Sequence, residues 1–479
     1  MSRIVLSREE FRDKVYACWM GKNIGGTLGA PYECARHTFD LTFYDPVPDK
    51  AAPNDDLDLQ LVWLQMLEEQ GVAPALPQFA EYWIRYAKSY PWDEYGFFVR
   101  NYMRGLRPPV AGCFENYYVD AMGSPIRSEI WAVLHAGDPQ AAAAMAWKDS
   151  ALDHAGGEGM HGEMFWAAVQ AAAFVENDPL TLINIGLNMI PLSSLVGRAV
   201  REAVLCHQRG LNWGRAREKI TLWLNHIHAC QAPINHAFTI IGWLYGKDFG
   251  DKLCKAVNCG YDTDCTCATL GATLGIINGG GGIPELWRKP IGEEIVLHKF
   301  TRGLPAPKTI AELTDRSIVL AEKAAAGKSN VGFGDHTIIP DDVLSGLFRN
   351  DMALTARRQD VHTAVETCGD QTVEFHYNGE PVLRPGISRD IQITLNGQER
   401  AVDLVCPPEW QTLSLGNGRF RLYCSGPVQD RNQVKVRLDG QAVSFTILGP
   451  DEATGWPIGE NVPKCPRCNA RIEACICPK

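Results

Sequence analysis

The chain has 479 residues, more than one ordinary hydrophobic core accommodates, so we expect two or more domains. Its hydrophobic content of 46% and charged content of 21% are typical of a globular protein that folds in water. The formal net charge of −10 argues against general nucleic-acid binding and against an anionic membrane surface, because phosphate groups attract basic surfaces.

Residues 1–22 carry charges throughout and contain no long apolar stretch, so they do not resemble a signal peptide. No other run is long and apolar enough to span a membrane. We therefore expect a cytoplasmic protein in which the 16 cysteines are reduced thiols. Most of them stand alone and are interpreted as small buried side chains.

The first 330 residues are predicted to form an all-α domain. Apolar residues recur every three or four positions, glycine or proline stands at many segment ends, and strand-like alternation is scarce. The predicted helices are 8–28, 57–70, 139–148, 162–175, 193–208, 213–225 and 309–326.

The sequence becomes strand-like after a short helical stretch at 341–348. Apolar and polar residues alternate at 373–377, 391–395, 434–438 and 443–447. Asn-Gly or Asp-Gly pairs lie between such runs, and these pairs favour hairpin turns because both residues accept positive φ. They stand at 378–379, 396–397, 417–418 and 439–440. A small antiparallel β-sandwich over 331–460 is the natural interpretation, as an accessory domain without a catalytic cluster.

The tail, residues 461–479, places four cysteines in one short segment: Cys465, Cys468, Cys475 and Cys477. Four thiolates around one structural Zn²⁺ are the economical explanation, and Cys-x₂-Cys is a good half-site. The Cys-x-Cys spacing of the second half is tighter than usual. The alternative is a disordered tail with reduced or adventitiously oxidised thiols.

Two acidic clusters each precede a helix-like segment. Asn54-Asp55-Asp56 follows a proline-rich loop, and helix capping explains this cluster by itself, because Asn and Asp are good N-caps and acids in the first turn complement the helix dipole. Asp262-Thr263-Asp264-Cys265 precedes a segment with a stripe of small residues, which permits close packing of a buried helix: Ala268, Gly271, Ala272 and Gly275.

Carboxylates at the end of a buried helix need neutralising partners, and no Lys or Arg lies near the second cluster in the sequence. Divalent cations would neutralise them, and hard oxygen ligands suit Mg²⁺ or Mn²⁺. A third segment carries Gly21, Gly25 and Gly29 along one helix face and ends near Glu33. The glycines are interpreted as helix packing, and Glu33 as a carboxylate that reaches a cleft.

Three segments follow one another along the chain: Gly29-Ala30-Pro31-Tyr32-Glu33, Asn54-Asp55-Asp56-Leu57 and Asp262-Thr263-Asp264-Cys265. In this order they resemble the motifs of the ADP-ribosylglycohydrolases, the dinitrogenase-reductase-activating glycohydrolase family. The resemblance covers residues 10–290. It implies an orthogonal all-α bundle with a binuclear Mg²⁺ or Mn²⁺ centre that hydrolyses a glycosidic bond at the anomeric carbon of ribose.

The resemblance also assigns roles to residues. It implies Asn54, Asp55, Asp56, Asp262, Asp264 and Cys265 as metal ligands, and Glu33, Asp55 and Asp264 as catalytic residues. Leu57 and Cys265 stand where the family often has threonine, and a thiol is a poor partner for Mg²⁺. Substrate-side candidates are Gly123, Ser124 and His154. Their alternative interpretations are a turn, a helix cap and a satisfied interhelical residue.

The leading hypothesis is a metal-dependent glycohydrolase that removes ADP-ribose from a protein, a nucleic acid or a small molecule. A second hypothesis keeps the site but assigns another glycoside or nucleoside as substrate, since β-sandwich modules often accompany sugar hydrolases. A third is a non-catalytic binder of an ADP-ribose-like ligand. The four aspartates of the two clusters argue against that third hypothesis.

Overall fold

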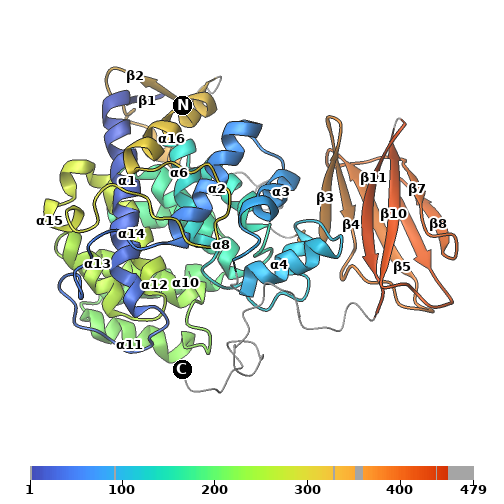
Figure 1. Cartoon of the computed structure of the whole chain (residues 1–479), viewed down its shortest axis with the longest axis horizontal. Coiled ribbons are helices and arrows are strands. Elements are labelled where there is room, and N and C mark those ends of the chain that lie inside the picture. Colours follow the sequence, from blue (N-terminus) through green and yellow to red (C-terminus); the bar gives the residue numbers. More distant parts are fainter. Residues whose placement is uncertain (1–2, 91–92, 327–329, 351–359, 439, 451–479) are drawn as a thin grey trace. The chain divides into compact units, whose positions relative to one another are not determined.

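The computed structural model describes residues 3–90, 93–326, 330–350, 360–438 and 440–450. The chain divides into two compact units (Figure 1). Unit 1 comprises Met1–Pro74, Asp120–Ser150 and Gly157–Arg358, and unit 2 comprises Ala75–Val119, Ala151–Gly156 and Gln359–Lys479. The predicted boundary at residue 330 falls inside unit 1. The tail with Cys465, Cys468, Cys475 and Cys477 lies outside the described residues, so its zinc site stays a prediction.

Unit 1 is mainly helical, as predicted. The seven predicted helices correspond to α1 (Arg8–Gly29), α2 (Asp55–Gln70), α7 (Pro139–Ser150), α8 (Glu158–Ala172), α10 (Leu195–Gln208), α11 (Trp213–Leu224) and α16 (Ile310–Ala325). The helix expected after the second acidic cluster is α14 (Thr263–Asn278). Further elements are η1 (Ala30–Tyr32), η2 (Pro125–Arg127), α6 (Ser128–Leu134), α9 (Pro179–Asn188), α12 (Ala232–Tyr245), α13 (Phe249–Asn258), η3 (Gly280–Gly282), α15 (Glu285–Arg288) and α17 (Val343–Leu347).

Helix α12 shows why some helices escaped prediction. Every residue from Ala232 to Trp243 is buried, so the helix has no solvent face and its sequence has no amphipathic period. The surrounding core of unit 1 contains fully buried tryptophans from several helices: Trp19, Trp63, Trp131, Trp166 and Trp243. Within the described residues, no helix combines the length and the apolar character needed to cross a lipid bilayer.

Helices α1 and α14 pack backbone against backbone along the predicted glycine and small-residue stripes. A Cβ atom on Gly25 would lie 2.1 Å from the carbonyl oxygen of Cys267, and one on Gly271 would lie 2.2 Å from that of Gly21. Only glycine permits this approach. At the end of the contact, Thr263 Oγ1 donates a hydrogen bond of 2.8 Å to the carbonyl oxygen of Gly29. The packing therefore holds the C-terminus of α1 against the N-terminus of α14.

One small sheet in unit 1 departs from the all-α prediction. Strands β1 (Ile4–Ser7) and β2 (Val331–Gly334) pair in parallel, with Ile4 opposite Val331. Each strand is only four residues long, too short for its alternation to be recognised in the sequence.

Unit 2 combines short helices with a β-sandwich. The helices are α3 (Leu76–Tyr86), α4 (Asp93–Met103) and α5 (Val110–Cys113). The strands are β3 (Thr363–Cys368), β4 (Gln371–His376), β5 (Arg389–Leu395), β6 (Gln398–Glu399), β7 (Asp403–Val405), β8 (Gln411–Gly416), β9 (Arg419–Tyr423), β10 (Arg431–Leu438) and β11 (Gln441–Leu448). One sheet has the order β3-β4-β5-β9-β8, with β6 beside β5, and the other has the order β11-β10-β7.

The two sheets pack face to face through alternating apolar residues. The rings of Phe375 and Phe445 stack with centroids 5.0 Å apart, and Tyr377 Oη donates a hydrogen bond to the carbonyl oxygen of Thr446. The predicted strands at 373–377, 391–395, 434–438 and 443–447 correspond to β4, β5, β10 and β11. The predicted antiparallel sandwich is therefore confirmed.

The asparagines of three predicted turns have the expected positive φ, whereas Asp439 of the fourth predicted turn lies outside the described residues. Asn396 and Asn417 have φ values of 51°, and each begins a tight connection between paired strands. Asn378 also has a positive φ of 52°, but the next strand begins only at Arg389. The turn at Asn378 therefore starts a longer connection instead of a two-residue hairpin.

Candidate metal centre

The first acidic cluster lies at the N-terminus of α2, where Asn54 is the N-cap. Asn54 Oδ1 accepts a hydrogen bond of 2.8 Å from the backbone N–H of Asp56, so the capping interpretation is correct for this residue. Its amide group packs on α1, since a Cβ on Gly26 would lie 1.6 Å from Asn54 Nδ2. The cap thereby fixes the start of α2 against α1, and metal binding by Asn54 stays a prediction.

The second acidic cluster behaves differently. Asp262 occupies the N-cap position of α14, but its side chain makes no capping hydrogen bond. Its backbone N–H donates to Asn235 Oδ1. The preceding Tyr261 has a positive φ of 71° and exchanges backbone hydrogen bonds with the segment after Glu33, one of them from Cys34. Capping does not explain the Asp262 carboxylate, and these bonds hold it close to Glu33.

The two clusters and Glu33 come together in unit 1. Ligand atoms of Glu33, Asp262 and Asp264 lie within 4.8 Å of one another, as do those of Asp56, Asp264 and Cys265. Asp264 belongs to both groups and links them.

Five oxygen atoms of this centre are buried and accept no hydrogen bond from the described part of the chain. They are both carboxylate oxygens of Asp56, both of Asp262, and Oδ1 of Asp264. Buried carboxylates without donors are costly unless a cation neutralises them. Oxygen atoms of this kind are the ligands that Mg²⁺ and Mn²⁺ prefer, so the donor set fits hard divalent cations.

The electrostatics agree with this interpretation. Burial and the charge of Asp55 raise the pKa of Asp264 from 3.8 to about 6. Burial is also the main reason why the pKa values of Asp56 and Asp262 lie well above 3.8. The charge of Asp264 is the main reason why the pKa of Glu33 rises to about 10. The carboxylates repel one another, and divalent cations would relieve that repulsion.

One cationic side chain in this centre was missed in the sequence. Lys22 Nζ lies 3.6 Å from Asp56 Oδ1 and 3.0 Å from Glu129 Oε2, and all three side chains are fully buried. Helix packing brings Lys22 from α1 to Asp56 of the first cluster, for which the sequence predicted no cationic partner. The sequence did contain a signal for this buried cation, because Lys22 stands in the glycine-rich, largely apolar end of α1. Among the described residues, no Lys or Arg pairs with Asp262 or Asp264.

Comparison with known proteins identifies the family. Residues 7–327, well over half of the chain, match the sequence model of the ADP-ribosylglycohydrolases. The chain belongs to the ADP-ribosylglycohydrolase family. The resemblance noted in the sequence is thereby confirmed. A solved structure named "ADP-ribosylglycohydrolase-related protein complex" is 18% identical, with a TM-score of 0.44, and the match covers 65% of this chain and 99% of that chain. No protein of curated function matches the sequence.

Two substrate-side candidates of this family member lie beside a buried polar network in unit 1. Ser124 is fully buried, and its hydroxyl donates a hydrogen bond to Glu163 instead of capping a helix. The carbonyl oxygen of Gly123 accepts a hydrogen bond of 2.9 Å from Arg127 Nη1, and Arg127 also pairs with Asp149 at 2.8 Å. The network fixes the loop that carries Gly123 and Ser124.

The third substrate-side candidate, His154, belongs to unit 2. Its Nδ1 atom lies 2.7 Å from Asp153 Oδ1, and its ring stands edge-on to Tyr95 in a fully buried position. These contacts engage Nδ1 within unit 2, whereas Nε2 is buried and has no hydrogen-bond partner among the described residues. The interpretation as a satisfied interhelical residue therefore holds for only one of the two ring nitrogens. A role of His154 in substrate binding stays a prediction.

Cys265 lies in the first turn of α14, close to Asp56 and Asp264. Burial, followed by the charge of Asp262, raises the pKa of its thiol well above the usual value. A protonated thiol is not a ligand for a hard cation. Metal binding by Cys265 therefore stays a prediction that the local electrostatics do not favour.

Proposed function

We propose that this family member is a Mg²⁺- or Mn²⁺-dependent glycohydrolase that cleaves the ribosyl glycosidic bond of an ADP-ribosylated substrate. The observation that carries the proposal is the convergence of Asp56, Asp262 and Asp264 with five buried carboxylate oxygens that accept no hydrogen bond from the described residues. Family membership supports glycohydrolase activity in general.

In this proposal, Asp55, Asp56, Asp262 and Asp264 hold two divalent cations, with Asn54 as a further oxygen donor. The bound ions would supply positive charge that holds ribose hydroxyls and favours ionisation of a water molecule. Lys22 Nζ, which lies 3.6 Å from Asp56 Oδ1 and 3.0 Å from Glu129 Oε2, would balance part of the negative charge of Asp56.

Glu33 is the residue of this centre best placed to move a proton. It is exposed to solvent, unlike the three buried aspartates, and its carboxylate lies within 4.8 Å of Asp262 and Asp264. Hydrolysis of a glycosidic bond passes through an oxocarbenium-like transition state that needs negative charge nearby and one proton transfer. We assign the proton transfer to Glu33 or Asp264, and the negative charge beside the sugar to Asp55 and Asp264.

The substrate-side assignments follow from the fixed loop. Because the Ser124 hydroxyl is committed to Glu163, we propose that the main chain at Gly123 and Ser124 contacts the ligand. His154 is retained as a further candidate from the family resemblance. The proposed partners are an ADP-ribosylated protein or a small-molecule glycoside.

The test is a release assay with two substrate panels. The protein is incubated with an ADP-ribosylated protein and with nitrophenyl glycosides, each with Mg²⁺, with Mn²⁺ and with chelator. Metal-dependent release of ADP-ribose, lost in D55N and D264N, supports the proposal. Release only from a nitrophenyl glycoside would show that the substrate is another glycoside instead of an ADP-ribosylated molecule. Tight binding of ADP-ribose without release would identify a non-catalytic binder.

A further inference from the structure

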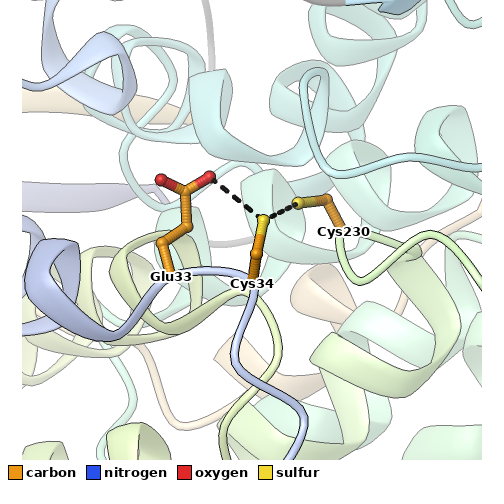
Figure 2. Close-up of side chains that lie close together, drawn as sticks. All are labelled: Glu33, Cys34 and Cys230. Carbon is orange, nitrogen blue, oxygen red and sulfur yellow. Dashed lines mark hydrogen bonds between the residues drawn. The ribbon is translucent and has the colours of Figure 1, made fainter. Parts of the chain in front are cut away.

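Two thiols lie beside Glu33 at the edge of the acidic centre (Figure 2). The Sγ atoms of Cys34 and Cys230 are 3.9 Å apart, and Cys34 Sγ is also 3.9 Å from Glu33 Oε1. One ligand atom of each residue lies within 4.8 Å of both others. The group thus offers two soft ligands and one hard ligand around a common point.

The spacing of the two sulfur atoms fits one shared metal ion. Two thiolates bound tetrahedrally to Zn²⁺ at about 2.3 Å lie about 3.8 Å apart, close to the separation between Cys34 and Cys230. A disulfide would require a separation of about 2.05 Å. Thiolates select soft or borderline ions such as Zn²⁺ over Mg²⁺, so this donor set differs in chemistry from the aspartate centre.

The main chain holds both cysteines in place. Cys34 has a left-handed φ of 65°, and its N–H donates a hydrogen bond of 2.7 Å to the carbonyl oxygen of Tyr261. The carbonyl oxygen of Cys230 accepts a hydrogen bond of 2.8 Å from the N–H of Met122. Cys34 is exposed, so an ion from solvent reaches the pair without rearrangement of the core.

We propose that Glu33, Cys34 and Cys230 form a binding site for a thiophilic divalent cation such as Zn²⁺, next to the aspartate centre. Binding replaces the two thiol protons by two metal–sulfur bonds and releases both protons to solvent. The Glu33 carboxylate supplies the third ligand, and water completes the coordination.

Glu33 belongs to both groups of ligands, and this sharing has a functional consequence. Its carboxylate lies within 4.8 Å of Asp262 and Asp264 as well as of the two thiols. An ion bound to the two thiols therefore also binds the carboxylate of Glu33, to which we assign proton transfer. This second step rests on the proposed function: Zn²⁺ at the thiol site inhibits hydrolysis that Mg²⁺ supports.

The test is a Cd²⁺ titration of the reduced full-length chain in excess Mg²⁺, followed by thiolate-to-Cd²⁺ charge-transfer absorbance. Cys465, Cys468, Cys475 and Cys477 are replaced by serine in all samples so that the tail does not contribute. We expect one Cd²⁺ per chain, and a loss of affinity of at least tenfold in C34S and in C230S. The control C368S, which changes a partly buried cysteine of β3, retains the signal.

An unchanged Cd²⁺ signal in both C34S and C230S overturns the site. Mg²⁺-dependent thermal stabilisation of each variant shows that the aspartate centre is still folded. The activity arm is separate: micromolar Zn²⁺ is expected to inhibit the parent protein and to spare C34S. Absence of any hydrolysis would refute the proposed function, whereas the Cd²⁺ titration would still decide the thiol site.

Discussion

Lys22 and Asp56 form an ion pair with a separation of 3.6 Å, and both side chains are completely buried. Burial alone would lower the pKa of Lys22, but the charges of Glu129 and Asp56 outweigh it and raise the pKa. Lys22 thus pairs with two carboxylates, those of Asp56 and Glu129. Its positive charge does not neutralise the other carboxylates of the acidic centre. The pair is a structural support of that centre and does not replace the cations we propose.

Replacing Lys22 with methionine is expected to destabilise the protein by about 3–5 kcal/mol, because removal of one partner strands buried charge. The free energy of unfolding in urea, measured with chelator, checks this value. The matched control is Arg8→Ala, which breaks the exposed pair with Glu322 and should cost less than about 1 kcal/mol. Equal losses in the two variants would contradict the role assigned to Lys22.

The same residue shows what sequence patterns can predict about this site. The glycine spacing on α1 predicted close helix packing correctly, because glycines repeated along one helix face let another backbone approach. The contact of Gly25 with Cys267 is an example. The partner of a buried charge has no such local signature. Lys22 and Asp56 are far apart in the sequence, and only the packing of α1 and α2 brings them together.

The sequence also could not show that the two acidic clusters differ in helix capping. Both place Asn or Asp at the N-cap position of a helix, yet Asn54 makes the capping hydrogen bond and Asp262 does not. The difference arises from the backbone before α14, where Tyr261 exchanges backbone hydrogen bonds with the segment that follows Glu33. Cys230 also joins the site through tertiary structure alone, whereas Cys34 stands next to Glu33 in the sequence.

The fold itself was predictable where periodicity is regular. Amphipathic helices such as α10 and alternating strands such as β10 were recognised, but α12 was not, because all its faces are buried. The association of 75–119 with the sandwich was also missed. It depends on non-local bonds, including the hydrogen bond from the N–H of Val365 to the carbonyl oxygen of Pro108 and the ion pair of Arg107 with Glu366.

Adding Mg²⁺ or Mn²⁺ is expected to stabilise the protein, since ions that bind only the folded state shift the unfolding equilibrium. At about 100 times the dissociation constant, the gain is about 2.7 kcal/mol. Asp264→Asn should abolish the gain, because Asp264 is shared by both groups of ligands. Thermal unfolding with metal and with chelator measures the effect. Asp315→Asn, at an exposed ion pair, should retain the full gain. A gain that persists in Asp264→Asn would exclude this residue as a ligand.

Gly25→Ala is expected to disrupt the packing of α1 on α14. The new Cβ would lie 2.1 Å from the carbonyl oxygen of Cys267, and a backbone atom cannot move aside as a flexible side chain does. The loss should reach or exceed about 3 kcal/mol, the upper end for overpacked cores. Gly214→Ala in α11 is the control, because its Cβ would make an ordinary contact at 3.6 Å. Urea unfolding should show that variant unchanged or stabilised by up to about 1 kcal/mol. Similar behaviour of the two variants would mean that α1 and α14 have room to separate.

His236 predicts how stability depends on pH, at a position separate from the proposed metal ligands. Its buried ring donates from Nδ1 to the carbonyl oxygen of Ala232 and packs on Trp166. Burial lowers its pKa from 6.5 to about 4, so the folded protein keeps the ring neutral while the unfolded chain takes up a proton. The stabilising contribution of His236 is complete above pH 6.5 and decreases as the pH falls towards 4.

His236→Gln removes this titration. The parent protein should therefore lose more stability than the variant between pH 6.5 and pH 4.5, by on the order of 2–3 kcal/mol, because one pKa unit corresponds to about 1.4 kcal/mol. Urea unfolding of both proteins at several pH values, with chelator present, isolates the difference, since the acidic centre is the same in both. Parallel pH profiles for the two proteins would show that His236 is not the group that makes the fold sensitive to acid.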